Sequence, residues 1–261
     1  MYLNPYYSFA FFAFLIVLYF SFAWRTYLRY LRAVKTHSES EVPLRYFTWY
    51  FMWMGIFFIF HWTPIIALYI GGPYSNYEWF KISHPWSHLM GHIFMHISFM
   101  FAALVGAHFS WPKLKPYFIA WIAIVAIFIG TIVTILHPQT TEIIGPVMTG
   151  GDSGLVAFFV ACGALGILYT GLVFLWQAFK THDKNLRIRS ALISIGMILF
   201  FFGGPMNDAA GTVPAVLRAY FVVVLGVILQ AIGILMKGSD LQPTLPPQPS
   251  SQKPQNFKKI A

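Results

Sequence analysis

Long apolar segments with at most one charged side chain recur along the whole of this 261-residue chain. All but one, the segment Ser190–Gly204, are long enough to cross a bilayer, for which a helix needs about 17–25 apolar residues. Only 10% of the residues are charged, whereas roughly a quarter are charged in soluble domains. Because backbone polar groups inside lipid must bond within their own segment, such segments fold as helices. The sequence therefore predicts an all-α, polytopic integral membrane bundle, placed in the cell membrane, without a large soluble domain.

Seven of these segments are expected to cross the membrane. They are Tyr6–Trp24, Tyr46–Ile70, His84–Phe109, Tyr117–Leu136, Gly154–Ala178, Ser190–Gly204 and Ala215–Met236. Residues 1–236 would thus form one seven-helix transmembrane domain. Residues 237–261 are rich in proline, glutamine, serine and lysine, which predicts a disordered cytoplasmic tail.

The basic residues are distributed unequally between the two sides of the predicted bundle. With seven crossings, 15 of the 17 lysines and arginines fall on one side, and only Lys81 and Arg218 fall on the other. Cytoplasmic loops of membrane proteins carry the excess of basic residues, so we expect the N-terminus outside and the C-terminus inside. The lipid bilayer is the expected environment, and contacts with anionic lipid account for these charges. Nucleic acid is not an expected partner.

Four histidines follow one another at a spacing of four residues in the third of these segments. They are His84, His88, His92 and His96, and no Asp, Glu, Lys or Arg interrupts them. Each step of four turns a helix by only 40° beyond a full turn, so the last three share one stripe, with Met95 in the same sector. An ionisable side chain inside a membrane segment is costly and usually functional. The stripe is therefore the best candidate for a functional site.

A fifth histidine, His61, lies in the second predicted helix. It would be about 13 Å below the outer end of that helix, and His92 about 12 Å below the outer end of the third. The two histidines are therefore level and can meet if these helices are neighbours. Pro64 would kink the helix beside His61. Gly55 and Gly91 would let a bulky group approach the backbone.

Facing histidines in a helical bundle are typical of haem and transition-metal sites. The residues predict a redox-active metal centre, either haem b or copper, without deciding between them. The preferred ligands are His61 and His92. His88 and His96 are competing metal ligands. Met95 and Asp152 are expected to lie beside the cofactor. A proton-relay or ligand-sensing role for the stripe, and simple helix packing, are the alternatives. If the protein is catalytic, the expected reaction is electron transfer.

Three other residues have simpler expected roles. Asp152 and Ser153 stand where they would cap the fifth helix. Gln230, in the last predicted helix, is expected to make an interhelical hydrogen bond. Cys162 is the only cysteine, so no intrachain disulfide is possible, and it lies in an apolar run that favours packing.

Residues 83–92 read SHPWSHLMGH. This stretch resembles the His-Met-x-x-His helix of a seven-span membrane family linked to copper delivery in cytochrome c oxidase assembly. Residues 151–155 resemble the acidic position at the start of a span in that family. The resemblance covers about a quarter of the chain. It implies a copper role for His88 and His92.

The last two predicted helices carry several glycines, at positions 196, 203, 204, 226 and 233. They resemble the membrane sensor part of some seven-span histidine kinases, which implies a detached sensor module. Taken together, the patterns lead to the expectation of a subunit in a respiratory or metal-handling complex, with partner membrane subunits. A small-ligand sensor and a structural accessory subunit without cofactor are the alternatives.

Overall fold

The structure, a computed structural model, describes residues 5–75, 77–136, 141–144, 147–150, 154–208 and 212–236. Within these ranges only the backbone is placed at residues 5–8, 64–75, 77–85, 141–144, 147–150, 207–208 and 213. The predicted disordered tail, residues 237–261, lies outside the described residues. So does the cap predicted at Asp152 and Ser153.

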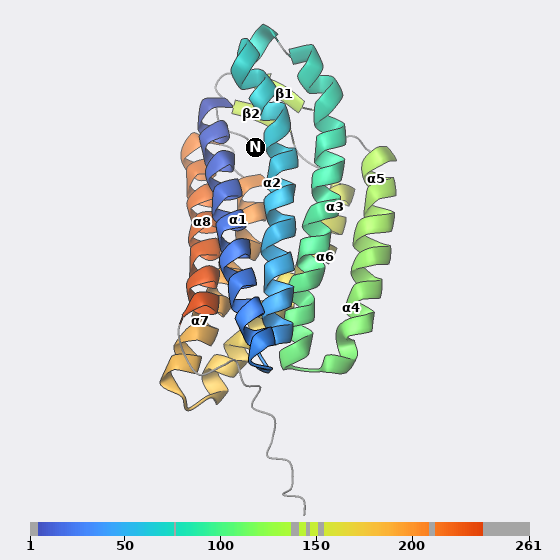
Figure 1. The fold of residues 1–261 in the computed structure, drawn as a ribbon. Helices are drawn as coiled ribbons and strands as arrows, with labels where there is room; N and C mark the ends of the chain where they lie inside the picture. The colour runs from blue at the N-terminus through green and yellow to red at the C-terminus, as the bar shows by residue number, and fades with distance from the viewer. Residues whose placement is uncertain are drawn as a thin grey trace, which may run out of the picture.

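The chain folds into a bundle of long helices (Figure 1). Six of them are α1 (Pro5–Lys35), α2 (Glu41–Ser75), α3 (Tyr77–Phe109), α6 (Gly154–Lys180), α7 (Lys184–Asp208) and α8 (Val213–Leu235). Between α3 and α6 runs a composite rod of four short segments: η1 (Pro112–Leu114), α4 (Lys115–Trp121), the π-helical η2 (Ile122–Ile129) and α5 (Gly130–Leu136). All seven apolar segments are thus helical over their described residues.

Contacts between helices form a closed circuit. Consecutive members of the series α1, α2, α3, α6, α7 and α8 pack together, and α8 returns to α1. The composite rod lies outside this circuit, against α3 and α6 (Figure 1). Helix α3 is the most enclosed, since 67% of its most apolar stretch is buried, against 22–39% in the other candidate spans. The helix that carries the histidine stripe is therefore surrounded by protein on most sides.

Helix ends lie beyond those predicted from hydrophobicity. The first predicted helix stops at Trp24, but α1 continues to Lys35, and α2 already begins at Glu41. His37 ends α1 in a left-handed conformation, φ 50°, and the Ser38 N–H donates to the carbonyl of Ala33 at 2.9 Å. This pattern is a common helix stop. Polar residues do not end a helix by themselves, because backbone hydrogen bonding continues outside an apolar stretch.

Residues 141–150 contain a feature that the sequence does not indicate. Thr141–Ile144 (β1) and Val147–Gly150 (β2) pair antiparallel, with Thr141 opposite Gly150 and Ile144 opposite Val147. These residues fall in the connection between the predicted helices Tyr117–Leu136 and Gly154–Ala178, where no strand is expected. The four-residue strands are short, and the rest of the described chain is almost entirely helical, so the fold class is all-α with one small hairpin.

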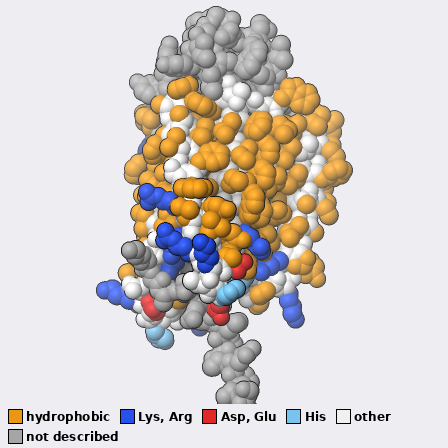
Figure 2. All heavy atoms as spheres, in the orientation of Figure 1, with side chains coloured by type: hydrophobic (Ala, Val, Ile, Leu, Met, Phe, Trp, Pro, Cys, Tyr) orange, Lys and Arg blue, Asp and Glu red, His pale blue; other side chains and the backbone are white. Residues whose placement is uncertain are grey.

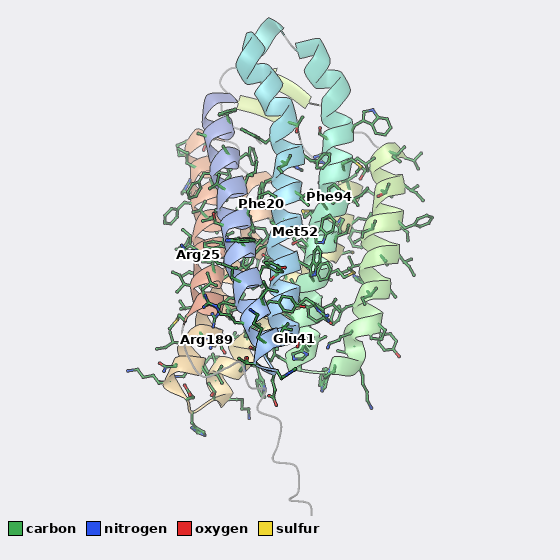
Figure 3. All side chains as sticks on the ribbon, in the orientation of Figure 1. Phe20, Arg25, Glu41, Met52, Phe94 and Arg189 are labelled. Carbon is green, nitrogen blue, oxygen red and sulfur yellow. The ribbon has the colours of Figure 1, made fainter. Side chains whose placement is uncertain are left out.

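Six helical segments are long and apolar enough to cross a membrane by length and composition. They are the described apolar parts of α1, α3, α6, α7 and α8 and the composite rod. Their outward faces carry exposed large side chains such as Phe128, Phe158 and Leu172. Figure 2 shows hydrophobic side chains over most of the visible face, with lysines and arginines gathered toward one end. Arg189 and Glu41 lie toward that same end (Figure 3). The protein has the character of a multi-pass membrane protein, embedded in a lipid bilayer.

Polar contacts inside the bundle join helices that are distant in sequence. The Tyr50 hydroxyl donates to Oε1 of Gln230 at 3.0 Å, and Nε2 of Gln230 donates to the carbonyl of Gly196 at 3.0 Å. The interhelical hydrogen bond predicted for Gln230 is confirmed. Gly196 also allows α7 and α8 to approach closely, since a Cβ on it would lie 2.5 Å from the carbonyl oxygen of Gly226.

Candidate metal centre

Helices α2 and α3 run antiparallel and pack against each other, which brings His61 to the histidine stripe. His61 lies 14 residues before the end of α2 at Ser75, and His92 lies 15 residues after the start of α3 at Tyr77. At 1.5 Å per residue both are about 21–23 Å from the turn that joins the helices. Both helices are longer than expected, but they extend by similar amounts, so the two histidines remain level.

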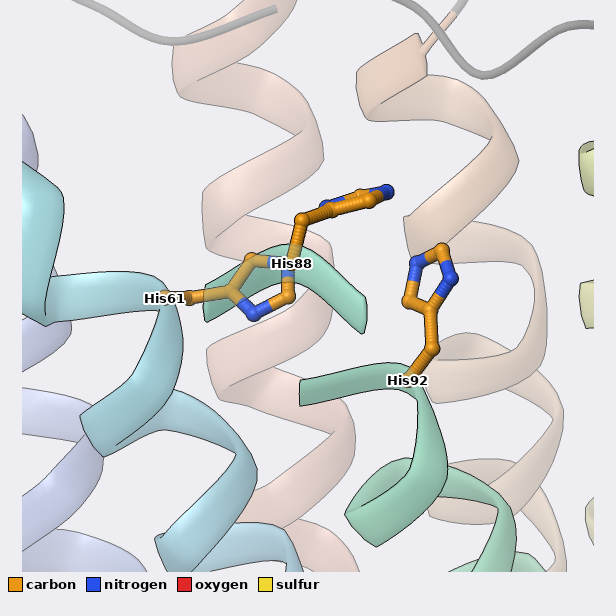
Figure 4. Close-up of side chains that lie close together, drawn as sticks. All are labelled: His61, His88 and His92. Carbon is orange, nitrogen blue, oxygen red and sulfur yellow. The ribbon is translucent and has the colours of Figure 1, made fainter. Parts of the chain in front are cut away.

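Three imidazoles meet at this point. His61, His88 and His92 each offer one ring nitrogen, and the three nitrogens all lie within 4.8 Å of one another. The ring centres are 5.4 Å apart for His61 and His88, 6.2 Å for His61 and His92, and 4.0 Å for His88 and His92. Figure 4 shows the three side chains converging from the two helices. Among the described side chains, no carboxylate or thiol belongs to this group.

The trio lies inside the protein. His88 is 5% exposed and His92 is 8% exposed, while His61 is half-buried. The ring of Phe57 packs on His61, with centres 4.3 Å apart. Three neutral imidazoles in such surroundings are suitable ligands for a transition-metal ion, and three protein ligands leave further coordination positions open.

Two glycines that were expected to admit a bulky group are covered by side chains instead. A Cβ on Gly91 would lie 2.7 Å from Nδ1 of His61, so this glycine makes room for a ligand ring. A Cβ on Gly55 would lie 3.0 Å from the ring of Phe20. Pro64 lies within α2, which continues past it to Ser75. The space that Gly91 provides is therefore occupied by the site itself.

His96 lies one turn further along α3, outside the trio. Its ring centre is 6.4 Å from that of His92, and its side chain is 3% exposed. Among the described residues, Nδ1 of His96 has no hydrogen-bond partner. This nitrogen lies against Gly163 of α6, where any Cβ would collide with it. Helix α6 thus provides room for His96 as α3 provides room for His61.

A small cavity adjoins His92 and His96. The two histidines line it together with Thr131 and Thr134 of α5, and apolar side chains from α3, η2 and α6 complete the wall. The Thr134 hydroxyl donates to the carbonyl of Gly130 at 2.8 Å. Neither His61 nor His88 lines this cavity, so it lies beside the trio and not within it.

The other predicted site residues are either outside the trio or not described. Met95 is buried in the main hydrophobic cluster of the bundle. Met90, which belongs to the copper-family resemblance, is exposed. His84 is part of α3, but its side chain is not among the described residues. Asp152 lies outside the described residues, so no contact with the histidines is assigned to it.

Sequence reasoning did not identify Gly163, Thr131 or Thr134 as neighbours of the stripe. Gly163 stands between Cys162 and Ala164, and such a run of small residues in an apolar helix is a recognisable signal for close helix contact. The two threonines have no comparable signal. Their place depends on the π-helical segment that precedes them, and such segments occur often at functional sites.

Comparison with protein families, with curated proteins and with solved structures finds no match to this chain. The fold and the site therefore define its class: a multi-pass, helical membrane protein with three histidines placed near enough to one another to hold a metal ion.

Proposed function

We propose that this protein binds a single transition-metal ion through His61, His88 and His92, and that the ion is copper. The observation that carries the proposal is the convergence of three ligand nitrogens within 4.8 Å inside an apolar bundle. Imidazole binds copper more strongly than the other divalent metals of the first transition row. The resemblance of residues 83–92 to a copper-delivery helix favours the same ion.

Small side-chain movements would complete such a site. Metal–nitrogen bonds of about 2.0–2.1 Å place two ligand nitrogens roughly 3.3–3.6 Å apart in tetrahedral or trigonal geometry. The present separations, up to 4.8 Å, exceed this by about 1 Å. Rotation of the imidazoles about their side-chain bonds covers that difference without movement of α2 or α3.

The arrangement favours an ion over haem b. Two histidines that hold haem iron must leave the space between them to the porphyrin. Here His88 lies close to both candidate axial ligands, with its ring centre 5.4 Å from that of His61 and 4.0 Å from that of His92. Haem would have to displace His88, whereas an ion uses it.

The proposal includes a topology. All seven helical segments, α2 among them, cross the membrane, with the N-terminus outside and the C-terminus inside. The distribution of 15 of 17 basic residues supports this orientation. The trio then lies in the outer half of the membrane.

The proposed role is metal handling or electron transfer within a membrane complex. Such a complex would include partner membrane subunits. Copper bound by neutral imidazoles can change its oxidation state or be passed on to another protein. A respiratory assembly is one setting in which both are needed.

Copper(II) titration of the purified protein against a competing chelator tests the proposal. We expect one ion per chain, confirmed by elemental analysis. His92→Ala should abolish binding, because His92 approaches both other rings. His182→Ala is the control, since His182 is exposed in the connection after α6. A Soret band in the protein as isolated, or equal binding by the two variants, would contradict the proposal.

A further inference from the structure

His92 has two ring nitrogens, and they face different surroundings. Figure 4 shows one of them on the side of His88 and the other on the opposite side. The nitrogen on the side of His88 faces the trio. His92 also lines the cavity that contains His96, and neither His61 nor His88 does so. The same imidazole thus borders two separate places.

The second place is bordered by His96, whose Nδ1 lies against Gly163 outside the cavity lining, so a ligand in the cavity would use the other ring nitrogen, Nε2. His96 is buried, and its Nδ1 has no hydrogen-bond partner among the described residues. A buried polar atom left without a partner costs about 1–3 kcal/mol. A purely structural site would be expected to place an apolar side chain here, since Gly163, Ala126 and Val160 surround it with small and apolar groups. A bound ligand would explain why a histidine occupies this buried position.

Ring separations allow His92 to share an ion on either side. An imidazole centre lies about 3.2 Å from a metal bound to its nitrogen, so two rings on one ion have centres at most about 6.4 Å apart. His92 is 4.0 Å from His88 and 6.4 Å from His96, so the second pair stands at the upper limit and the His96 ring must turn toward His92 for threonine oxygens to join the same ion. Two histidines four residues apart on a helix are an established way to hold a metal ion. His92 forms such a pair in both directions.

The cavity provides oxygen donors for the inner pair. Thr134 gives its hydroxyl hydrogen to the carbonyl of Gly130, which leaves the lone pairs of its oxygen available. Thr131 lines the same cavity. Two imidazoles with hydroxyl oxygens form a weaker set of ligands than three imidazoles, because copper prefers nitrogen donors.

We infer that the metal ion has two alternative positions that share His92. The outer position uses His61, His88 and His92, and the inner one uses His92 and His96 at the cavity. This inference rests on the proposed function. A neutral imidazole has one coordinating lone pair, so His92 serves one ion at a time and the two positions exclude each other. The histidine stripe is then a transfer path along α3, and the ion is cargo that moves between the two positions.

Removal of either end of the path tests the inference, with copper(II) alone as the probe and the full-length protein in detergent. His61→Ala/His88→Ala should still bind one ion, about tenfold or more weaker than the native chain, with fewer imidazole neighbours in X-ray absorption. Adding His96→Ala to that pair should remove the remaining binding. His96→Ala alone should keep the outer position and its three imidazoles.

A glycine variant provides a second test that keeps every histidine. Gly163→Ala places a methyl group where the His96 ring lies, so in the His61→Ala/His88→Ala background it should abolish binding. Gly204→Ala is the matched control, because nothing lies within 4 Å of a Cβ there. If His61→Ala/His88→Ala binds no copper while the native chain does, the inner position is refuted and the proposed function stands. If the native chain binds none, both fail.

Discussion

The α-carbon of Gly91 lies beneath the imidazole of His61, so closely that a Cβ would stand 2.7 Å from Nδ1. This glycine is on α3, next to His92 in sequence, and His61 is on α2. The close approach of the two helices therefore sets the position of the ligand that α2 contributes. Phe57, whose ring centre lies 4.3 Å from that of His61, packs against the same imidazole.

Gly91→Ala is expected to weaken metal binding without removing any histidine. The new methyl group would overlap the His61 ring, which must rotate away from His88 and His92. Loss of ligand orientation typically lowers metal affinity by about 10–100-fold. Gly204→Ala, which meets no neighbour, is the control and should bind as the native chain does. Unchanged copper affinity of Gly91→Ala would show that His61 is not a ligand.

The hydrogen bond between Tyr50 and Gln230 is expected to stabilise the bundle only modestly. It links α2 to α8 at 3.0 Å, and Gln230 also donates to the carbonyl of Gly196 on α7. Interhelical hydrogen bonds in membranes contribute about 0.6 kcal/mol on average. A double-mutant cycle with Tyr50→Phe and Gln230→Leu, measured by unfolding in mixed micelles, should give a coupling of that size. Strict additivity would contradict the contact.

Arg189 is expected to stabilise the end of α8. Its side chain is 2% exposed, and Nε donates to the carbonyl of Gly233 at 3.2 Å. The guanidinium of Arg29, on α1, donates to the carbonyl of the next residue of α8, Ile234, at a distance of 2.6 Å. Hydrogen bonds from charged groups contribute about 1.5–3 kcal/mol, so Arg189→Met should lower the free energy of unfolding by that amount. Arg187→Met, at an exposed position, should change it by less than about 0.5 kcal/mol.

Labelling of introduced cysteines tests the proposed topology. Cys162 is buried, and Cys162→Ala gives a background without thiols. Glu39→Cys and His182→Cys lie in exposed turns at one end of the bundle, and Thr212→Cys is exposed at the start of α8. A membrane-impermeant maleimide should label only Thr212→Cys in intact cells. Labelling of Glu39→Cys from outside would reverse the orientation.

The helices of this protein are predictable because the signal for each is local. A run of about 20 apolar residues must become a helix in lipid wherever it lies in the bundle. The ends were less predictable, as α1 shows by continuing eleven residues past Trp24. The hairpin at residues 141–150 was missed because pairing of two four-residue strands depends on their surroundings and not on hydrophobicity.

The candidate site, too, was predictable from the sequence only in part. The stripe of His88, His92 and His96 follows from helical periodicity, which needs only the sequence. The burial of these histidines does not follow from periodicity, because periodicity does not indicate whether a stripe faces lipid or protein. That outcome depends on the place of α3 inside the circuit of helices, between α2, α6 and the composite rod.

The sequence alone determined that this chain forms apolar helices and that one of them carries ligand-type side chains at one-turn spacing. Only the tertiary structure decided which of those side chains come together. His61 joins His88 and His92 because α2 and α3 pack antiparallel at equal depth, and His96 is separated from them because it faces Gly163 of α6. Distances between helices depend on packing around all of them, which no single segment encodes.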